Sequence, residues 1–223
     1  MMDLSPIWLT LRLATVTTII LLLVGTPLAW WLAHSRARLV PAVEALTALP
    51  LVLPPTVLGF YLLLLFNPQA GLGAFWLNLT GETLSFSFSG LVIASLFYSL
   101  PFVVQPLQTA FQGQGRGAME AAATLGARPL DAFMTIASPL AARGFLTAAV
   151  LGFAHTVGEF GVVLMVGGNI PGRTQVISIA IYEQVETLDY AQAHQWSALL
   201  LAFSFLTLLL VYSLNRRAAP RVG

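Results

Sequence analysis

Lysine and cysteine are both absent from this chain. Without lysine the chain cannot build a P-loop, whose lysine contacts the β- and γ-phosphates of ATP, and it cannot form a lysine Schiff base. Without cysteine it cannot form disulfides, thiolate metal sites or a cysteine nucleophile. The three histidines, His34, His155 and His194, do not have the spacing of metal ligands. The sequence therefore predicts no catalytic residue and no metal site.

Charge is also scarce. Charged residues make up 9% of the 223 residues and hydrophobic residues make up 57%, whereas a soluble domain carries about 25% charged residues. So little charge cannot cover a water-facing surface. The composition therefore predicts an all-α integral membrane protein.

Five segments are apolar enough to cross a bilayer as α-helices, which takes roughly 20 residues each. They run from about residue 7 to 33, 46 to 66, 88 to 111, 145 to 167 and 196 to 214. We expect one transmembrane domain over residues 1–223, with its core at about 9–214. Trp30 and Trp31 suit the membrane interface at the end of the first span.

The arginines predict how the bundle is oriented. Only Arg12 and Arg173 fall in segments that an outside N-terminus would place outside. The segments that would then lie inside hold Arg36, Arg38, Arg116, Arg128, Arg143, Arg216, Arg217 and Arg221. Because positive charge accumulates on the cytoplasmic side, we expect the N-terminus outside and, after five spans, the C-terminus inside.

The inner loop at residues 112–143 is patterned. Residues 120–125 are strong helix formers, Gly126 suits the position after a helix end, and Pro129 suits the first turn of a second helix. We expect Pro139 to close that second helix. The loop is therefore predicted to contain two short helices joined by a tight turn.

This loop resembles the EAA loop of ABC importer permeases, with Ser138 standing where the family prefers leucine. The resemblance implies an importer-type permease fold and a cytoplasmic coupling loop that contacts a separate ATPase subunit. The matching residues are Glu120, Ala121, Ala122, Gly126, Ile136 and Pro139.

The same resemblance implies partners and a location. We expect a homodimer in the lipid of the bacterial inner membrane, two ATP-binding subunits that use ATP and Mg, and an extracytoplasmic oxyanion-binding protein. No cofactor is expected on this chain, and no nucleic-acid partner.

Two further stretches predict the cargo. Residues 49–63 are similar to the second span of molybdate permeases, and residues 158–161 with 168–174 are similar to a pattern of molybdate and sulfate permeases. The Asn-Ile-Pro-Gly run and residues 179–182 favour molybdate. Sulfate and tungstate remain alternatives, as does a proton-coupled secondary transporter that would use Glu159.

Several residues are candidates for the transport pathway or its gate. Prolines inside spans are tolerated where the freed backbone groups are buried or line a cavity. A carboxylate within a span, such as Glu159, is costly, and we expect it in a hydrogen-bonded structural or gating role. His155 is expected to be packed, and the segment 174–194 to form a short helix or hairpin that meets a partner protein. The candidates are Pro54, Pro55, Thr56, Glu159, Asn169 and Arg173.

Overall fold

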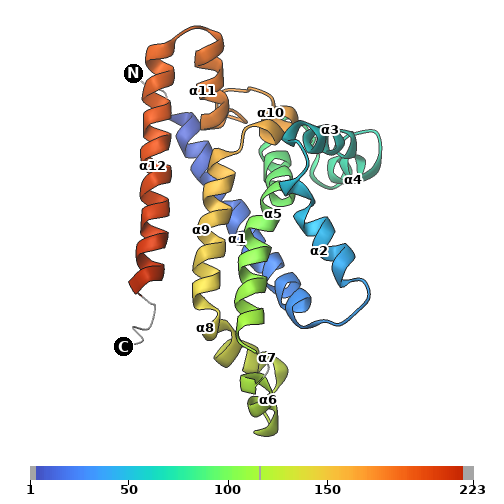
Figure 1. The fold of residues 1–223 in the computed structure, drawn as a ribbon. Coiled ribbons are helices and arrows are strands. Elements are labelled where there is room, and N and C mark those ends of the chain that lie inside the picture. Colours follow the sequence, from blue (N-terminus) through green and yellow to red (C-terminus); the bar gives the residue numbers. More distant parts are fainter. Residues whose placement is uncertain (1–3, 116, 218–223) are drawn as a thin grey trace.

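Four long helices dominate the computed structural model, which describes residues 4–115 and 117–217. They run along a common direction (Figure 1), and all regular structure in the described ranges is helical, as expected. Helices α1, α5 and α9 pack against one another, and α12 packs against α9 and α11. Their bounds are α1 Ser5–His34, α5 Phe88–Gly113, α9 Ala142–Gly158 and α12 Tyr190–Arg217.

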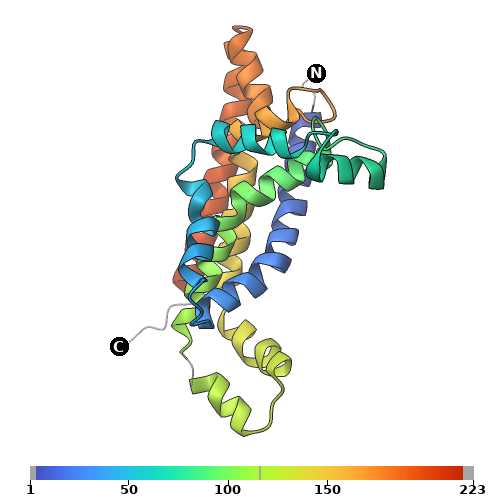
Figure 2. The same ribbon diagram turned by 90° about the vertical axis from the view of Figure 1, so that its right-hand side faces the viewer.

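Shorter helices connect the long ones. Between α1 and α5 lie α2 (Val40–Ala48), the 3-10 turn η1 (Leu49–Leu51), α3 (Pro55–Leu65) and α4 (Gly71–Thr80). Between α9 and α12 lie α10 (Gly161–Gly167) and α11 (Ile177–Glu186). Helices α3, α4, α10 and α11 gather at the end of the bundle where the chain begins, whereas the segment between α5 and α9 lies beyond the opposite end (Figures 1 and 2).

Small residues bring α5 and α9 close together. A Cβ built on Gly152 would lie 2.5 Å from Cγ2 of Val103, and Gly144 faces Ala110 at still closer range. Glycine at these positions lets two membrane helices approach where a larger side chain would separate them. The core around this contact is apolar and includes Leu21, Ala29, Val104, Leu107, Phe111 and Ala148.

The segment predicted as the second span, residues 46–66, is not one straight helix. Its two halves are bent by 109° between Val40–Leu51 and Pro55–Leu65. Pro54 is extended, at φ −54° and ψ 135°, because Pro55 disfavours helical geometry in the residue before it. The two consecutive prolines thus explain the break.

By length and apolarity, α1 and α5 each suffice to cross a membrane, and the described residues contain up to four spans if each bent pair counts as one. The second bent pair joins Pro129–Leu140 to α9 at 72°. The fifth expected segment, residues 196–214, falls within the 28-residue α12.

The predicted fourth span, residues 145–167, is also interrupted. Helix α9 ends at Gly158, and α10 begins at Gly161. Glu159 lies between them in an extended conformation, at φ −67° and ψ 132°. Glu159 therefore lies at a helix break and not inside a continuous span as the sequence had suggested.

Candidate functional site

The segment predicted as a coupling loop forms two short helices beyond the end of the bundle (Figure 2). The first is α6 (Gly117–Thr124), and the second is a composite of α7 (Pro129–Ala132), the π-turn η2 (Phe133–Ala137) and α8 (Ser138–Leu140). Pro139 lies within α8, so the second helix continues one residue past the proline expected to close it.

Gly126 makes the turn between these helices. Its φ is +82°, its N–H donates to Ala123 O at 3.0 Å, and the N–H of Ala127 donates to Ala122 O at 3.0 Å. This pair of bonds is a Schellman motif, in which glycine takes the left-handed position after the helix. The prediction that Gly126 ends the first helix is confirmed.

Contacts at the base of the loop hold its two ends together and pack it against the bundle. Gln114 Nε2 donates to Ala137 O at 2.9 Å, which joins the two ends of the loop. The Phe133 ring lies 5.1 Å from Trp30 and 6.0 Å from Phe111, measured between ring centroids. The second helix is therefore packed against both α1 and α5.

The loop exposes three large apolar side chains. Leu125, Leu130 and Met134 are 88%, 71% and 60% exposed. Glu120 and Ala121 are exposed beside them, whereas Ala122 and half-buried Ile136 contribute to the packing between the helices. Large apolar side chains exposed on such a loop are typical of a protein–protein contact.

A cavity of about 580 Å³ lies at the breaks between α9 and α10 and before α3. It brings together three predicted pathway residues. Pro55 and Thr56 are adjacent in the chain, and Glu159 lies more than 100 positions after them. Its walls are Pro55, Thr56, Tyr98, Ala154, His155, Gly158, Glu159, Phe160 and Gly161.

The other predicted pathway residues do not line this cavity. Pro54 caps α3 immediately beside it. Asn169 and Arg173 lie exposed on the turn between α10 and α11, which buried Thr174 braces by donating to Gly167 O at 2.7 Å. The structure thus places these two side chains at the end of the bundle where α1 begins, and neither lines the cavity.

Glu159 is held at the helix break by hydrogen bonds from α10 and α11. Its Oε1 accepts from Val162 N at 2.8 Å, and its backbone oxygen accepts from Ser178 Oγ at 2.5 Å. The first bond satisfies a backbone donor at the start of α10 that has no partner within the helix. The residue is 5% exposed, and its carboxylate is hydrogen-bonded, as expected.

His155 lines the same cavity and is oriented by a chain of hydroxyls. Its Nδ1 lies 3.0 Å from Ser99 Oγ, which lies 3.0 Å from Thr156 Oγ1, which in turn donates to Gly152 O at 2.9 Å. Each hydroxyl carries one proton, so Ser99 donates to Thr156 and His155 Nδ1–H donates to Ser99. The network therefore assigns the proton to Nδ1.

Two aromatic rings also pack against His155. Its ring stacks on Phe102 with centroids 3.8 Å apart and lies 5.0 Å from the ring of Tyr98. The prediction that His155 is packed is confirmed, but its place in the cavity wall was not expected. Sequence reasoning missed it because Ser99 and His155 are 56 residues apart and meet only through the packing of α5 on α9.

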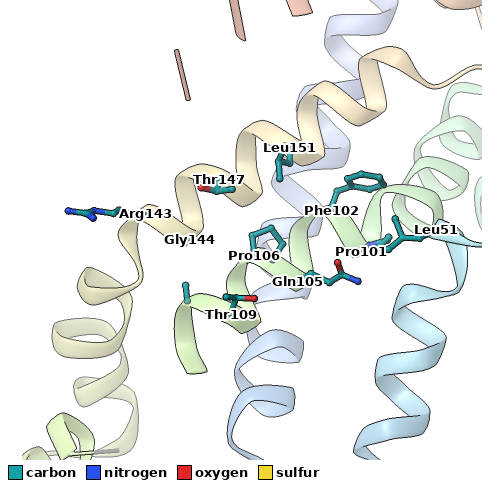
Figure 3. A pocket seen from close by; sticks show the side chains of 11 residues that line it. Leu51, Pro101, Phe102, Gln105, Pro106, Thr109, Arg143, Gly144, Thr147 and Leu151 are labelled. Atoms are coloured by element: carbon teal, nitrogen blue, oxygen red, sulfur yellow. The ribbon is translucent and has the colours of Figure 1, made fainter. Parts of the chain in front are cut away.

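A second cavity, of about 570 Å³, continues between α5 and α9 towards the coupling loop. Figure 3 shows Gln105 and Thr109 on α5, Thr147 and Leu151 on α9, and Leu51 at the end of η1 around it. Its residues on α5 and α9 recur every three or four positions in register with those of the first cavity. The two cavities therefore follow one face of each helix.

The segment 174–194 forms a helical hairpin of α11 and the start of α12, as expected. The Tyr182 hydroxyl donates to Glu186 Oε1 at 2.5 Å, and this bond raises the pKa of Tyr182. Arg12 lies exposed with its Cζ 4.4 Å from the centre of the Phe88 ring.

Comparison with known proteins defines the class to which this architecture belongs. Residues 25–223 match the family of binding-protein-dependent transport system inner membrane components. The chain belongs to this family and is a multi-pass inner membrane protein.

Individual relatives show which transport permeases of the family this chain is similar to. The chain is 58% identical, over 96% of its length and 95% of the relative's, to the molybdenum transport system permease protein ModB of Azotobacter vinelandii. It is 33% identical to the putative molybdenum transport system permease protein YvgM of Bacillus subtilis, over 93% of this chain and 91% of that one. It is also 34% identical to the sulfate transport system permease protein CysT of a Synechocystis strain, over 86% of this chain and 67% of that one.

Proposed function

We propose that this chain is the permease subunit of an ATP-driven importer and that it carries molybdate. The observation that carries the proposal is the 58% identity, over 96% of the chain, to a molybdenum transport system permease. The two cavities along α5 and α9 supply a route for the anion, lined mainly by apolar side chains, with Arg143 as a positive charge and Thr56, Gln105 and Thr109 as neutral hydrogen-bonding groups. Neutral donors suit a passing dianion because they orient it without trapping it.

The loop at 112–143 is the proposed contact with the ATP-binding subunit. Its exposed leucines and methionine supply an apolar docking surface, and the Schellman turn at Gly126 sets the angle between the two helices. ATP and Mg would be used by that subunit, because this chain has no lysine for a P-loop. Movement of the ATPase would then shift the bundle between two arrangements.

The proposed topology has five spans, with the N-terminus outside and the C-terminus inside. Arg36, Arg38, Arg128 and Arg143 belong to segments at the coupling-loop end of the bundle, whereas Arg12 and Arg173 lie at the opposite end. This distribution supports a cytoplasmic loop by the positive-inside rule. Asn169 and Arg173 would then lie outside, where an extracytoplasmic binding protein releases its anion.

We also propose a homodimer with two ATP-binding subunits. Thr56 and Gln105 line the cavities yet are exposed in the single chain, so one copy supplies only part of a wall. A second copy facing this surface would complete it. A permease that stays monomeric after gentle detergent extraction with its ATPase would count against this arrangement.

Uptake of labelled molybdate in cells that lack only this subunit tests the cargo. Restoring the gene should restore uptake, and tungstate and sulfate are added as competitors. Sulfate is the second candidate because of the identity to CysT. Restored sulfate uptake without molybdate uptake would reject molybdate, and uptake without an ATPase subunit would favour the secondary-transporter alternative.

A further inference from the structure

A third cavity lies at the end of α1 that adjoins the coupling loop, apart from the two pathway cavities. Its volume is about 230 Å³, enough for roughly seven water molecules at their volume in the liquid. None of its lining residues is acidic. They are Ala33, His34, Ser35, Arg36, Phe111, Gln112 and Gly115.

The lining presents hydrogen-bond donors. Ser35 Oγ accepts from Ala37 N at 3.2 Å, so its own proton remains available to donate. His34 Nδ1 lies 3.0 Å from Trp30 O; because a carbonyl only accepts, Nδ1 carries the proton and gives it to α1, so Ser35 and Arg36 supply the donors to the cavity. Arg36 adds a permanent positive charge with the planar donor geometry that matches phosphate oxygens.

The depth of this cavity in a membrane follows from the length of α1. Thirty residues rise about 45 Å, whereas the hydrocarbon core is about 30 Å thick. The last residues of α1 therefore reach the headgroup region. Trp30 and Trp31 immediately precede the cavity, and tryptophan is enriched at the membrane interface.

We propose that this cavity binds the phosphate group of an anionic phospholipid. Arg36 and Ser35 contact the phosphate oxygens, and the apolar side chains of Ala33 and Phe111 face the glycerol end. Gly115 lies near the start of the coupling loop. A bound headgroup therefore bridges the end of α1 and the base of the loop. The inference rests on the proposed function only in placing this end in the cytoplasmic leaflet.

The test uses the permease–ATPase complex in nanodiscs of phosphatidylcholine, with or without phosphatidylglycerol. The variants are Arg36→Gln and, as the matched control, Arg38→Gln, whose arginine is exposed and does not line the cavity. Phosphatidylglycerol should raise the thermal unfolding midpoint of the wild type and of Arg38→Gln by about 2–4 °C, the shift typical of 1 kcal/mol in a protein of this size. Arg36→Gln should lose most of that shift.

Each other outcome overturns the proposal. The three proteins should unfold at the same midpoint in phosphatidylcholine alone, which checks that Arg36→Gln is folded. No lipid effect in the wild type, or an equal loss in both variants, would show that no such site exists. Inorganic phosphate that raises the midpoint in phosphatidylcholine as much as phosphatidylglycerol does would assign the site to a free anion. The unfolding midpoint is measured without transport, so the result does not depend on whether molybdate is the cargo.

Discussion

Gly161 at the start of α10 lies directly against Pro55 at the start of α3: a Cβ on Gly161 would be 2.6 Å from the Cβ of Pro55. Each of the two residues adjoins one of the two helix breaks, and both line the first cavity, which Glu159 also lines. A second close contact follows along the helices, where a Cβ on Gly59 would lie 2.7 Å from that of Met165. Helices α3 and α10 therefore pack closely as a pair, with a glycine of each helix against a side chain of the other.

Gly161→Ala should separate this pair. The proline ring is rigid and cannot give way, so overpacking should cost about 1–3 kcal/mol and lower the uptake rate. Gly158→Ala is the matched control for stability, because a Cβ there meets nothing within 4 Å. Thermal unfolding of the purified complex and molybdate uptake measure both effects. Equal behaviour of the two variants would contradict the close packing.

Glu159→Gln and Glu159→Ala should differ. Glutamine keeps an oxygen that can accept from Val162 N, whereas alanine leaves that buried donor unpaired at a cost of about 1–3 kcal/mol. We expect Glu159→Gln to retain uptake and Glu159→Ala to lower both stability and uptake. Loss of uptake in a stable Glu159→Gln protein would instead indicate that the carboxylate exchanges protons during transport.

Ser95 and Ser99, one turn apart on α5, should respond oppositely to alanine. Ser99 is the link between His155 and Thr156, so its removal should destabilise the complex by about 1–3 kcal/mol. Ser95 Oγ is buried without a hydrogen-bond partner among the described residues, so Ser95→Ala should be neutral or stabilising. Unfolding midpoints of the two variants make the comparison, and equal losses would refute the hydroxyl chain.

Gly126→Val should uncouple ATP hydrolysis from uptake. Valine at φ +82° carries a left-handed penalty of roughly 1–2 kcal/mol, which the loop relieves by changing the angle between its helices. Gly117→Ala is the control, since Gly117 has open space around it and lies in α6. ATPase activity and uptake are measured in the same vesicles. Uptake and ATPase stimulation that both survive in Gly126→Val would rule out this role for the turn.

Local signals predicted the coupling loop well. The helix formers at 120–125, Gly126 and Pro129 act within one or two turns of chain, and the structure has the helix, the left-handed turn and the second helix where they were expected. The all-α class follows equally from apolar composition, which needs no knowledge of packing.

Long-range features could not be predicted in the same way. The prolines at 54 and 55 suggested irregularity, but the 109° bend also depends on α3 packing against α10. Similarly, Gly158 and Gly161 flank Glu159 and could have indicated a break, yet the apolar run suggested one continuous span. His155, Tyr98 and Thr56 line one cavity only because the helices that carry them pack together. No local sequence pattern connects these residues.

The two helix breaks have a mechanical consequence. Helix α9 has 17 residues and is therefore a stiff rod about 25 Å long, with the coupling loop at one end and the Glu159 break at the other. Helix α3 is packed on α10 and is joined to η1 through only residues 52–54. A push on the loop would thus travel along α9 to the break at Glu159, beside which α3 and α10 pack on each other and on α5.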